Sequence, residues 1–152
     1  MPTVLRWAKF AVAAALAVTA LVYLDLVLRA RSAYLEGERF LEWHRDPEAK
    51  KSHFEAEFQR ESRRLDAEKS AGRLSEPEFL QRMELERFRR DEAVAESSVK
   101  YAYHWYKTAV ELFSPPESRW VRLSREKMAL TKDLWKQELD RRKIPYEEYM
   151  LE

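Results

Sequence analysis

The three histidines of the sequence are the side chains most suited to metal binding or acid–base chemistry. A di-iron or di-manganese helical bundle needs Glu-x-x-His motifs, but Leu41, Lys50 and Tyr101 stand three residues before the histidines. The His-Glu-x-x-His motif of zinc proteases is also missing from the sequence. For His44 and His104 we expect a structural role beside aromatic neighbours, with haem ligation as the alternative.

The third histidine, His53, lies four residues before Glu57, and the two side chains could share a metal ion. Two ligands without a third make a poor site, so we expect an ordinary ion pair on a helix surface. The sequence contains no cysteine, which excludes thiolate catalysis and cysteine-bound metals. We therefore expect neither a metal nor another cofactor.

Two further patterns associated with chemistry are weak. The serines lack the glycine elbow and the nearby histidine that nucleophilic catalysis uses. Arginines cluster at residues 60–64 and 87–90, but acidic residues interleave both clusters and the net charge is only +1. We therefore expect no enzyme, no small-molecule substrate and no nucleic-acid partner.

Composition restricts the elements that can position these side chains. Only two of the 152 residues are glycine, which disfavours the turns of a β-sandwich and glycine-rich nucleotide-binding loops. We predict an all-α fold, in which a single N-terminal transmembrane helix precedes long helices in a helical hairpin or irregular bundle.

The stretch Ala8–Leu28 is the predicted transmembrane helix. Its 21 residues, of which residues 10–24 carry no charge, would span about 30 Å, the thickness of the hydrocarbon core of a bilayer. Residues suited to the membrane interface stand near its ends: Trp7, Tyr23, Arg29 and Arg31.

One carboxylate, Asp25, lies about a turn from the edge of the hydrocarbon core, where it needs water or a cation. We expect an intrahelical pair with Arg29, and the alternative is a contact to a second membrane subunit. Ala13, Ala17 and Ala20 would let another helix approach closely on nearly the same side of the span.

A cleaved signal peptide, cut after Ala20, is the rival interpretation of this segment. Cleavage would leave the apolar sequence LVYLDLVL exposed, so we expect an uncleaved anchor. Basic charges are balanced across the span, and acidic residues after it favour a cytoplasmic N-terminus. The rest of the chain would then face the periplasm or exterior of a bacterial inner membrane.

Prolines and capping residues divide the remaining chain. The anchor helix is predicted to continue to about Arg45, and further helices are predicted over residues 47–70, 76–113 and 116–143, with a last short turn at 146–150. Gly72 is a predicted helix stop, and Ser75 and Ser114 each precede a glutamate at capping-box spacing.

These elements define the predicted organisation of the chain. Residues 1–31 form the tail and anchor, and residues 32–152 form the extramembrane domain. The domain comprises a helical hairpin (47–113), an aromatic corner (99–143) and a tail (144–152). The core is expected where the helices before and after Ser114-Pro115-Pro116 pack on each other.

Apolar side chains of the hairpin should face each other across its two helices: Phe54, Phe58 and Leu65 on one, and Phe79, Leu80, Met83 and Phe88 on the other. Aromatic residues of the corner and tail are the candidate contacts for a partner protein: Tyr101, Trp105, Trp120, Trp135, Tyr146 and Tyr149. Met150 and Leu151 of the exposed-looking tail join this group.

Together these features favour a single-pass, membrane-anchored accessory or scaffolding subunit. It would contact the lipid bilayer and other subunits of a membrane complex through helix–helix and aromatic contacts. The alternative is a membrane-tethered helical adaptor or sensor that recruits a soluble partner.

Overall fold

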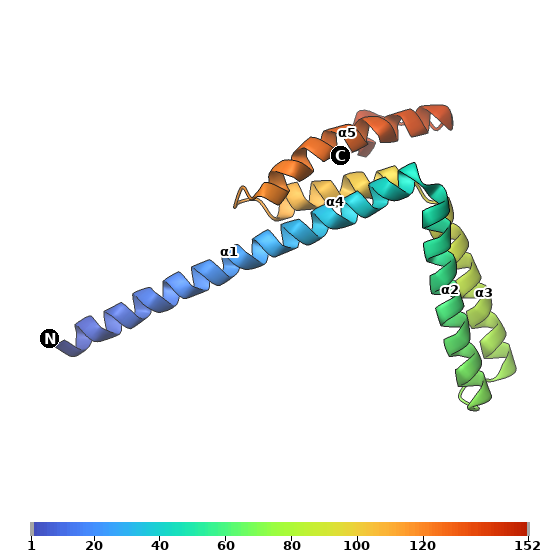
Figure 1. Ribbon diagram of the computed structural model, residues 1–152, viewed down its shortest axis with the longest axis horizontal. Helices are drawn as coiled ribbons and strands as arrows, with labels where there is room; N and C mark the ends of the chain where they lie inside the picture. Colours follow the sequence, from blue (N-terminus) through green and yellow to red (C-terminus); the bar gives the residue numbers. More distant parts are fainter. Residues whose placement is uncertain (1, 152) are drawn as a thin grey trace. The chain divides into compact units, whose positions relative to one another are not determined.

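The computed structural model describes the backbone of residues 2–151 and the side chains of residues 7 and 9–151. Figure 1 shows the elements in chain order: α1 (Pro2–Arg45), α2 (Pro47–Ser70), α3 (Glu76–Ala95), α4 (Ser98–Leu112), α5 (Arg119–Arg141) and the short 3-10 helix η1 (Glu148–Leu151). These residues contain no strand, which confirms the all-α class. The chain divides into unit 1, residues up to 40 and from 99 onward, and unit 2, residues 41–98.

α1 is one continuous helix that ends at Arg45, as predicted. Its described side chains are exposed through residue 25, whereas Ala30 is fully buried and Ala33 is 2% exposed. By length and composition the helix can cross a membrane. The first half of α1 is therefore an unburied apolar rod, and the second half is a core element of unit 1.

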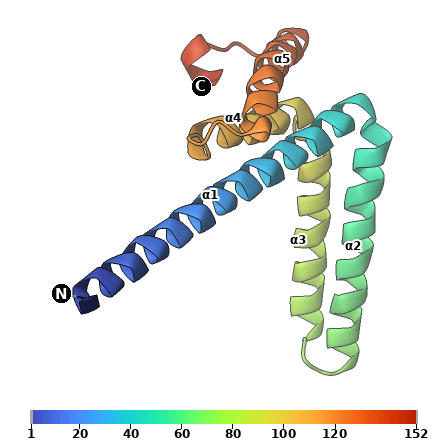
Figure 2. The ribbon, with the colours of Figure 1, turned by 60° about the vertical axis from the view of Figure 1, so that its left-hand side comes forward.

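α2 and α3 form the antiparallel hairpin of unit 2 (Figure 2). Asp46 caps the start of α2 by accepting a backbone hydrogen bond of 3.1 Å. α2 ends just before Gly72, whose φ is +69°. The N–H groups of Gly72 and Arg73 each donate to an α2 carbonyl at 2.9 Å, which is the Schellman arrangement. The predicted stop at Gly72 is confirmed.

The predicted single helix over residues 76–113 is wrong, because α3 ends at Ala95 and α4 begins at Ser98. Glu96 is extended, with φ −63° and ψ 148°. The buried Lys50 of α2 donates to the carbonyl oxygens of Val94 (3.1 Å) and Glu96 (2.6 Å). A cation satisfies free carbonyls at a helix C-terminus and is favoured by the helix dipole. A contact from α2 therefore stabilises the end of α3.

The hairpin buries fewer apolar side chains than predicted. Leu65 is 1% exposed, but Leu80 and Phe88 are 58% and 61% exposed, so the prediction that these two face α2 is wrong. The guanidinium of Arg90 lies 4.8 Å from the ring centroid of Phe58. Cation–π contacts thus supplement a thin apolar interface.

Unit 1 packs α4 and α5 against the second half of α1. Ala30, Ala33 and Gly37 give α1 a face of small residues, and the fully buried Tyr106 of α4 lies against it. A Cβ atom added at Gly37 would lie 2.5 Å from the Tyr106 ring. The core therefore includes α1, which the sequence-based prediction of an α4–α5 core omitted.

α5 begins at Arg119 rather than at residue 116 as predicted. Ser118 is the N-cap and accepts a hydrogen bond from the Val121 N–H (3.3 Å). The carboxylate of Glu117, expected to complete a capping box, accepts a long hydrogen bond from the Ser114 hydroxyl (3.5 Å) and shorter ones from both terminal nitrogens of Arg125, at 2.5 and 3.1 Å. This ion pair competes with the local cap.

The segment after α5 packs back onto unit 1. Leu151 is 1% exposed and joins Val99, Tyr103 and Trp135 in a buried cluster. The expectation that Leu151 is exposed to partners is therefore wrong. The short turn predicted at residues 146–150 is the 3-10 helix η1, shifted to Glu148–Leu151.

Candidate functional site

The unburied half of α1 is the first candidate site. Ala13, Ala17 and Ala20 are all exposed on it. A shallow apolar groove of about 340 Å³ is lined by Lys9, Val12, Ala13 and Leu16. Small side chains with a groove beside them are the features that let a second helix approach within a membrane.

Asp25 pairs with Arg29 on the same helix, as predicted. The Arg29 Nε atom donates to Asp25 Oδ2 at 2.7 Å, and both side chains are more than half exposed. At about 100° per residue, Asp25 lies roughly 80–140° around the helix from the three alanines. The expectation that Asp25 shares nearly their side of the span is therefore wrong.

The predicted interfacial residues lie near the two ends of the apolar stretch. Trp7 is 74% exposed and Tyr23 is 55% exposed. The guanidinium of Arg31 lies 5.7 Å from the ring centroid of Trp120, at the start of α5. The end of the apolar stretch is thereby joined to Trp120, a candidate partner residue that lies 89 positions later.

The aromatic candidates differ in how much surface they present. Tyr101 is 37% exposed and stacks on Phe40 with ring centroids 5.2 Å apart. Trp105 and Trp120 are half-buried, and Trp120 lies 5.5 Å from Tyr34. These residues keep exposed surface at the outside of unit 1.

The remaining candidates lie on α5 and beyond it. Trp135 is 7% exposed and packs on Tyr103, with ring centroids 5.7 Å apart, so most of its surface is used within unit 1. Tyr146 is half-buried against the same cluster, while Tyr149 is 68% exposed. A partner role remains a prediction for all six aromatic residues.

Glu38 is a polar centre of unit 1 that the sequence analysis missed. Its Oε1 atom accepts a hydrogen bond from the Tyr106 hydroxyl (2.6 Å) and lies 3.3 Å from Lys127 Nζ. Tyr34 also hydrogen bonds to this carboxylate. One side chain of α1 thus links α4 and α5. The available signal was a glutamate one turn after Tyr34 and next to a helical glycine.

Opposing effects act on the pKa of Glu38. Burial alone would raise it, but the hydrogen bond from Tyr106 and the charge of Lys127 lower the pKa below its usual value. The pKa of Tyr34 is raised, first by burial and then by the charge of Glu38 and the hydrogen bond to it. The carboxylate is therefore kept ionised as an acceptor, which is a structural role within the packed helices.

The histidines occupy ordinary structural positions. His53 Nε2 lies 3.4 Å from Glu57 Oε1, so these two side chains are in contact on the surface of α2 as predicted. His104 lies against Trp135 with ring centroids 5.6 Å apart. Burial, followed by the charges of Lys100 and Lys107, lowers the pKa of His104. No group of three ligand side chains gathers among the described residues.

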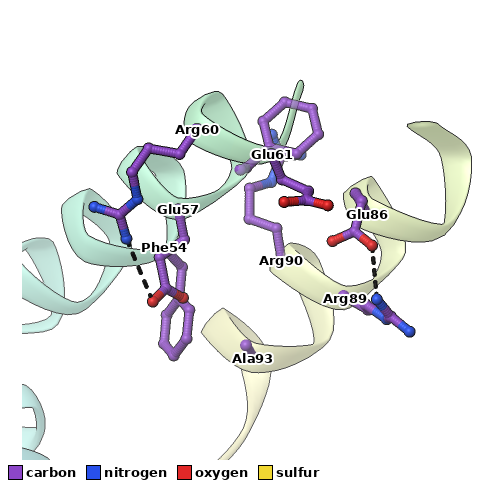
Figure 3. Close-up of a pocket in the computed structure, with 9 residues that line it drawn as sticks. Phe54, Glu57, Arg60, Glu61, Glu86, Arg89, Arg90 and Ala93 are labelled. Carbon is purple, nitrogen blue, oxygen red and sulfur yellow. Dashed lines mark hydrogen bonds and ion pairs between the residues drawn. The ribbon is translucent and has the colours of Figure 1, made fainter. Parts of the chain in front are cut away.

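A surface groove of about 550 Å³ lies between α2 and α3 in unit 2 (Figure 3). Four of its charged side chains pair with each other: Arg60 lies 3.6 Å from Glu57, and Arg89 lies 2.6 Å from Glu86. Arg90 pairs with residues outside the groove lining. An anionic ligand would have to displace these carboxylates, so the groove is a poor anion site.

Comparison of the chain with protein-family models, with curated proteins and with solved structures gives no match.

Proposed function

We propose that this chain is a single-pass membrane protein that acts as an accessory or scaffolding subunit of a larger membrane complex. The observation that carries the proposal is the unburied apolar half of α1. Phe10, Leu16 and Leu21 are each about two-thirds exposed, at 65%, 66% and 66%. Such a surface is unfavourable in water and favourable in lipid.

The polar groups of this half are compatible with lipid. Thr19 donates its hydroxyl to the carbonyl of Ala15 (2.9 Å), and Asp25 is paired with Arg29. Polar groups within a bilayer need such internal partners. The groove beside Ala13 supports a neighbouring membrane helix as the partner.

Extraction of membranes tests the anchor. Full-length protein should remain in the membrane pellet after alkaline carbonate washing. The double variant Leu16→Arg and Leu21→Arg should be released, because each arginine near the bilayer centre costs about 2.5–3.5 kcal/mol. Leu80→Arg on exposed α3 is the matched control and should stay in the pellet. Release of the unchanged chain would refute the anchor.

Co-purification tests the accessory role. The proposal expects multispan subunits to be recovered in stoichiometric amount with the full chain in mild detergent. Ala13→Leu with Ala17→Leu should reduce that recovery, because larger side chains, at the groove residue Ala13 and one turn further along at Ala17, would keep a second helix from approaching closely. Recovery of the chain alone from intact membranes would contradict the accessory role.

The orientation of α1 in the membrane is a separate part of the proposal. We place α1 in a bacterial inner membrane, with unit 2 on the periplasmic or exterior side. Added protease should then cleave unit 2 in intact spheroplasts. Protection in spheroplasts and cleavage only after lysis would reverse this orientation.

A membrane-tethered adaptor is the second candidate, and the outer face of α3 favours it. Leu80, Leu85 and Phe88 are 58%, 45% and 61% exposed there. A soluble partner that needs this face should be lost in Leu80→Ser with Phe88→Ser. The same variant should retain membrane subunits if the accessory role is correct.

A further inference from the structure

The turn between α4 and α5 lies where the apolar stretch of α1 ends. α4 is antiparallel to α1: Tyr101 stacks on Phe40, with ring centroids 5.2 Å apart, and Tyr106 lies against Tyr34 at 5.8 Å (Figures 1 and 2). Leu112 follows Tyr106 by six residues, which is about 9 Å along the helix axis. The end of α4 is thereby level with the first buried residues of α1.

Contacts at the start of α5 independently place the α4–α5 turn at the same position along the axis of α1. The Trp120 ring lies 5.7 Å from the guanidinium of Arg31 and 5.5 Å from the ring of Tyr34. Arg31 follows Leu28, the last residue of the apolar stretch, by about 4.5 Å along the helix. Trp120 therefore lies at the height where tryptophan is enriched in membrane proteins, the headgroup layer.

The α4–α5 corner, residues 111–122, combines apolar and cationic surface. Leu112 is 66% exposed. The two carboxylates of the corner are both paired with cations, because Glu111 lies 3.7 Å from Lys107 and Glu117 lies 2.5 Å from Arg125. Three exposed arginines at this height form no salt bridge within the described residues: Arg31, Arg119 and Arg122. The surface suits an anionic headgroup layer.

We propose that the α4–α5 corner rests on the headgroup layer of the bilayer that α1 crosses. Leu112 and Trp120 reach the boundary between headgroups and acyl chains. The exposed arginines bind the phosphate groups of anionic lipids. This inference rests on the proposed membrane insertion of α1, and it gives unit 1 a second attachment to the lipid surface.

Site-specific quenching tests the proposal in full-length protein. Because the sequence has no cysteine, Leu112→Cys, Val18→Cys and Leu130→Cys each provide one position for a fluorescent label. The labelled proteins are inserted into phosphatidylcholine vesicles, with or without phosphatidylglycerol, that contain brominated acyl chains as quenchers. Leu130, 46% exposed and about 15 Å along α5 from Trp120, is the matched control.

We expect quenching at Val18 and Leu112 and none at Leu130. Arg119→Gln with Arg122→Gln should lower the ratio of docked to undocked corner by roughly fivefold per arginine. Quenching at Leu112 should then fall in the phosphatidylglycerol vesicles, while quenching at Val18 stays the same.

The outcomes separate the two proposals. Quenching at Val18 without quenching at Leu112 would overturn the docked corner and leave the membrane anchor intact. Absence of quenching at Val18 would overturn the anchor itself. A blue-shifted but unquenched label at Leu112 would show that protein covers the corner, which would also overturn lipid docking. Equal quenching with and without phosphatidylglycerol would overturn the role of the arginines.

Discussion

Replacing Gly37 by alanine should destabilise unit 1, although alanine is the better helix former. The added Cβ would lie 2.5, 2.7 and 2.8 Å from three ring carbons of Tyr106. Carbon atoms in contact normally lie about 3.5–4.0 Å apart, so the ring would have to withdraw by about 1 Å. Withdrawal would also stretch the 2.6 Å hydrogen bond from the Tyr106 hydroxyl to Glu38.

The magnitude follows from two opposing contributions. Overpacking of a buried contact costs about 1–3 kcal/mol, whereas replacing glycine by alanine in a helix gains about 1 kcal/mol. Subtracting the gain from the cost leaves a net loss of at most about 2 kcal/mol, so we expect Gly37→Ala to lower the free energy of unfolding by up to about 2 kcal/mol. For a chain of this size the melting temperature would fall by roughly 2–4 °C per kcal/mol.

Thermal unfolding of the full chain in detergent, followed by near-ultraviolet circular dichroism, measures this loss. The decisive comparison uses Tyr106→Ala as the background. There the ring is absent, and Gly37→Ala should stabilise by about 1 kcal/mol. Ser32→Ala on the exposed face of α1 controls for helix propensity. Stabilisation by Gly37→Ala with Tyr106 present would refute the packing argument.

Four further results are expected. Lys50→Met should destabilise the hairpin by about 1–3 kcal/mol, because the carbonyl groups of Val94 and Glu96 lose their donor; hydrogen exchange should accelerate in unit 2 only. Lys143 has a φ of +55°, so Lys143→Gly should raise thermal stability by about 1 kcal/mol, whereas Arg142→Gly, at a right-handed residue, should lower it. The pKa of His104 is lowered in the fold, so the contribution of neutral His104 to stability should be complete above pH 6.5 and decline below it. His104→Gln should flatten this part of a stability–pH profile. Hydrogen bonds from two lysines of α5 lower the pKa of Glu148 to about 2. The stabilisation of η1 by Glu148 should therefore be present above pH 4.5 and lost toward pH 2. Line-broadening of the tail resonances in nuclear magnetic resonance spectra would report this transition, and Glu148→Gln should abolish it.

Local signals predicted the helix boundaries that local hydrogen bonds determine. Asp46 with Pro47, and Gly72 with its positive φ, marked the ends of α2 correctly, because capping uses residues within one turn. The break after Ala95 was not predictable in this way. It is accompanied by the contact from Lys50, which is more than forty residues away in the sequence.

The same division applies to the candidate site. The Asp25–Arg29 pair could be predicted, because it depends only on a spacing of four residues. Glu38 could not be predicted as a centre of unit 1, because its partner Tyr106 lies 68 positions away. Spacing gave no reason to place the two together, and the packing of α4 on the small residues of α1 is what joins them.

The absence of a linker between the exposed and packed halves of α1 has a torsional consequence. Because the helix is continuous, any rotation of the span about its own axis turns unit 1 by the same angle. Inserting one residue after Leu28 would change that angular phase by about 100° and lengthen the rod by about 1.5 Å. The direction in which the packed part of unit 1 faces around the axis of the proposed membrane span is therefore set by the number of residues in α1.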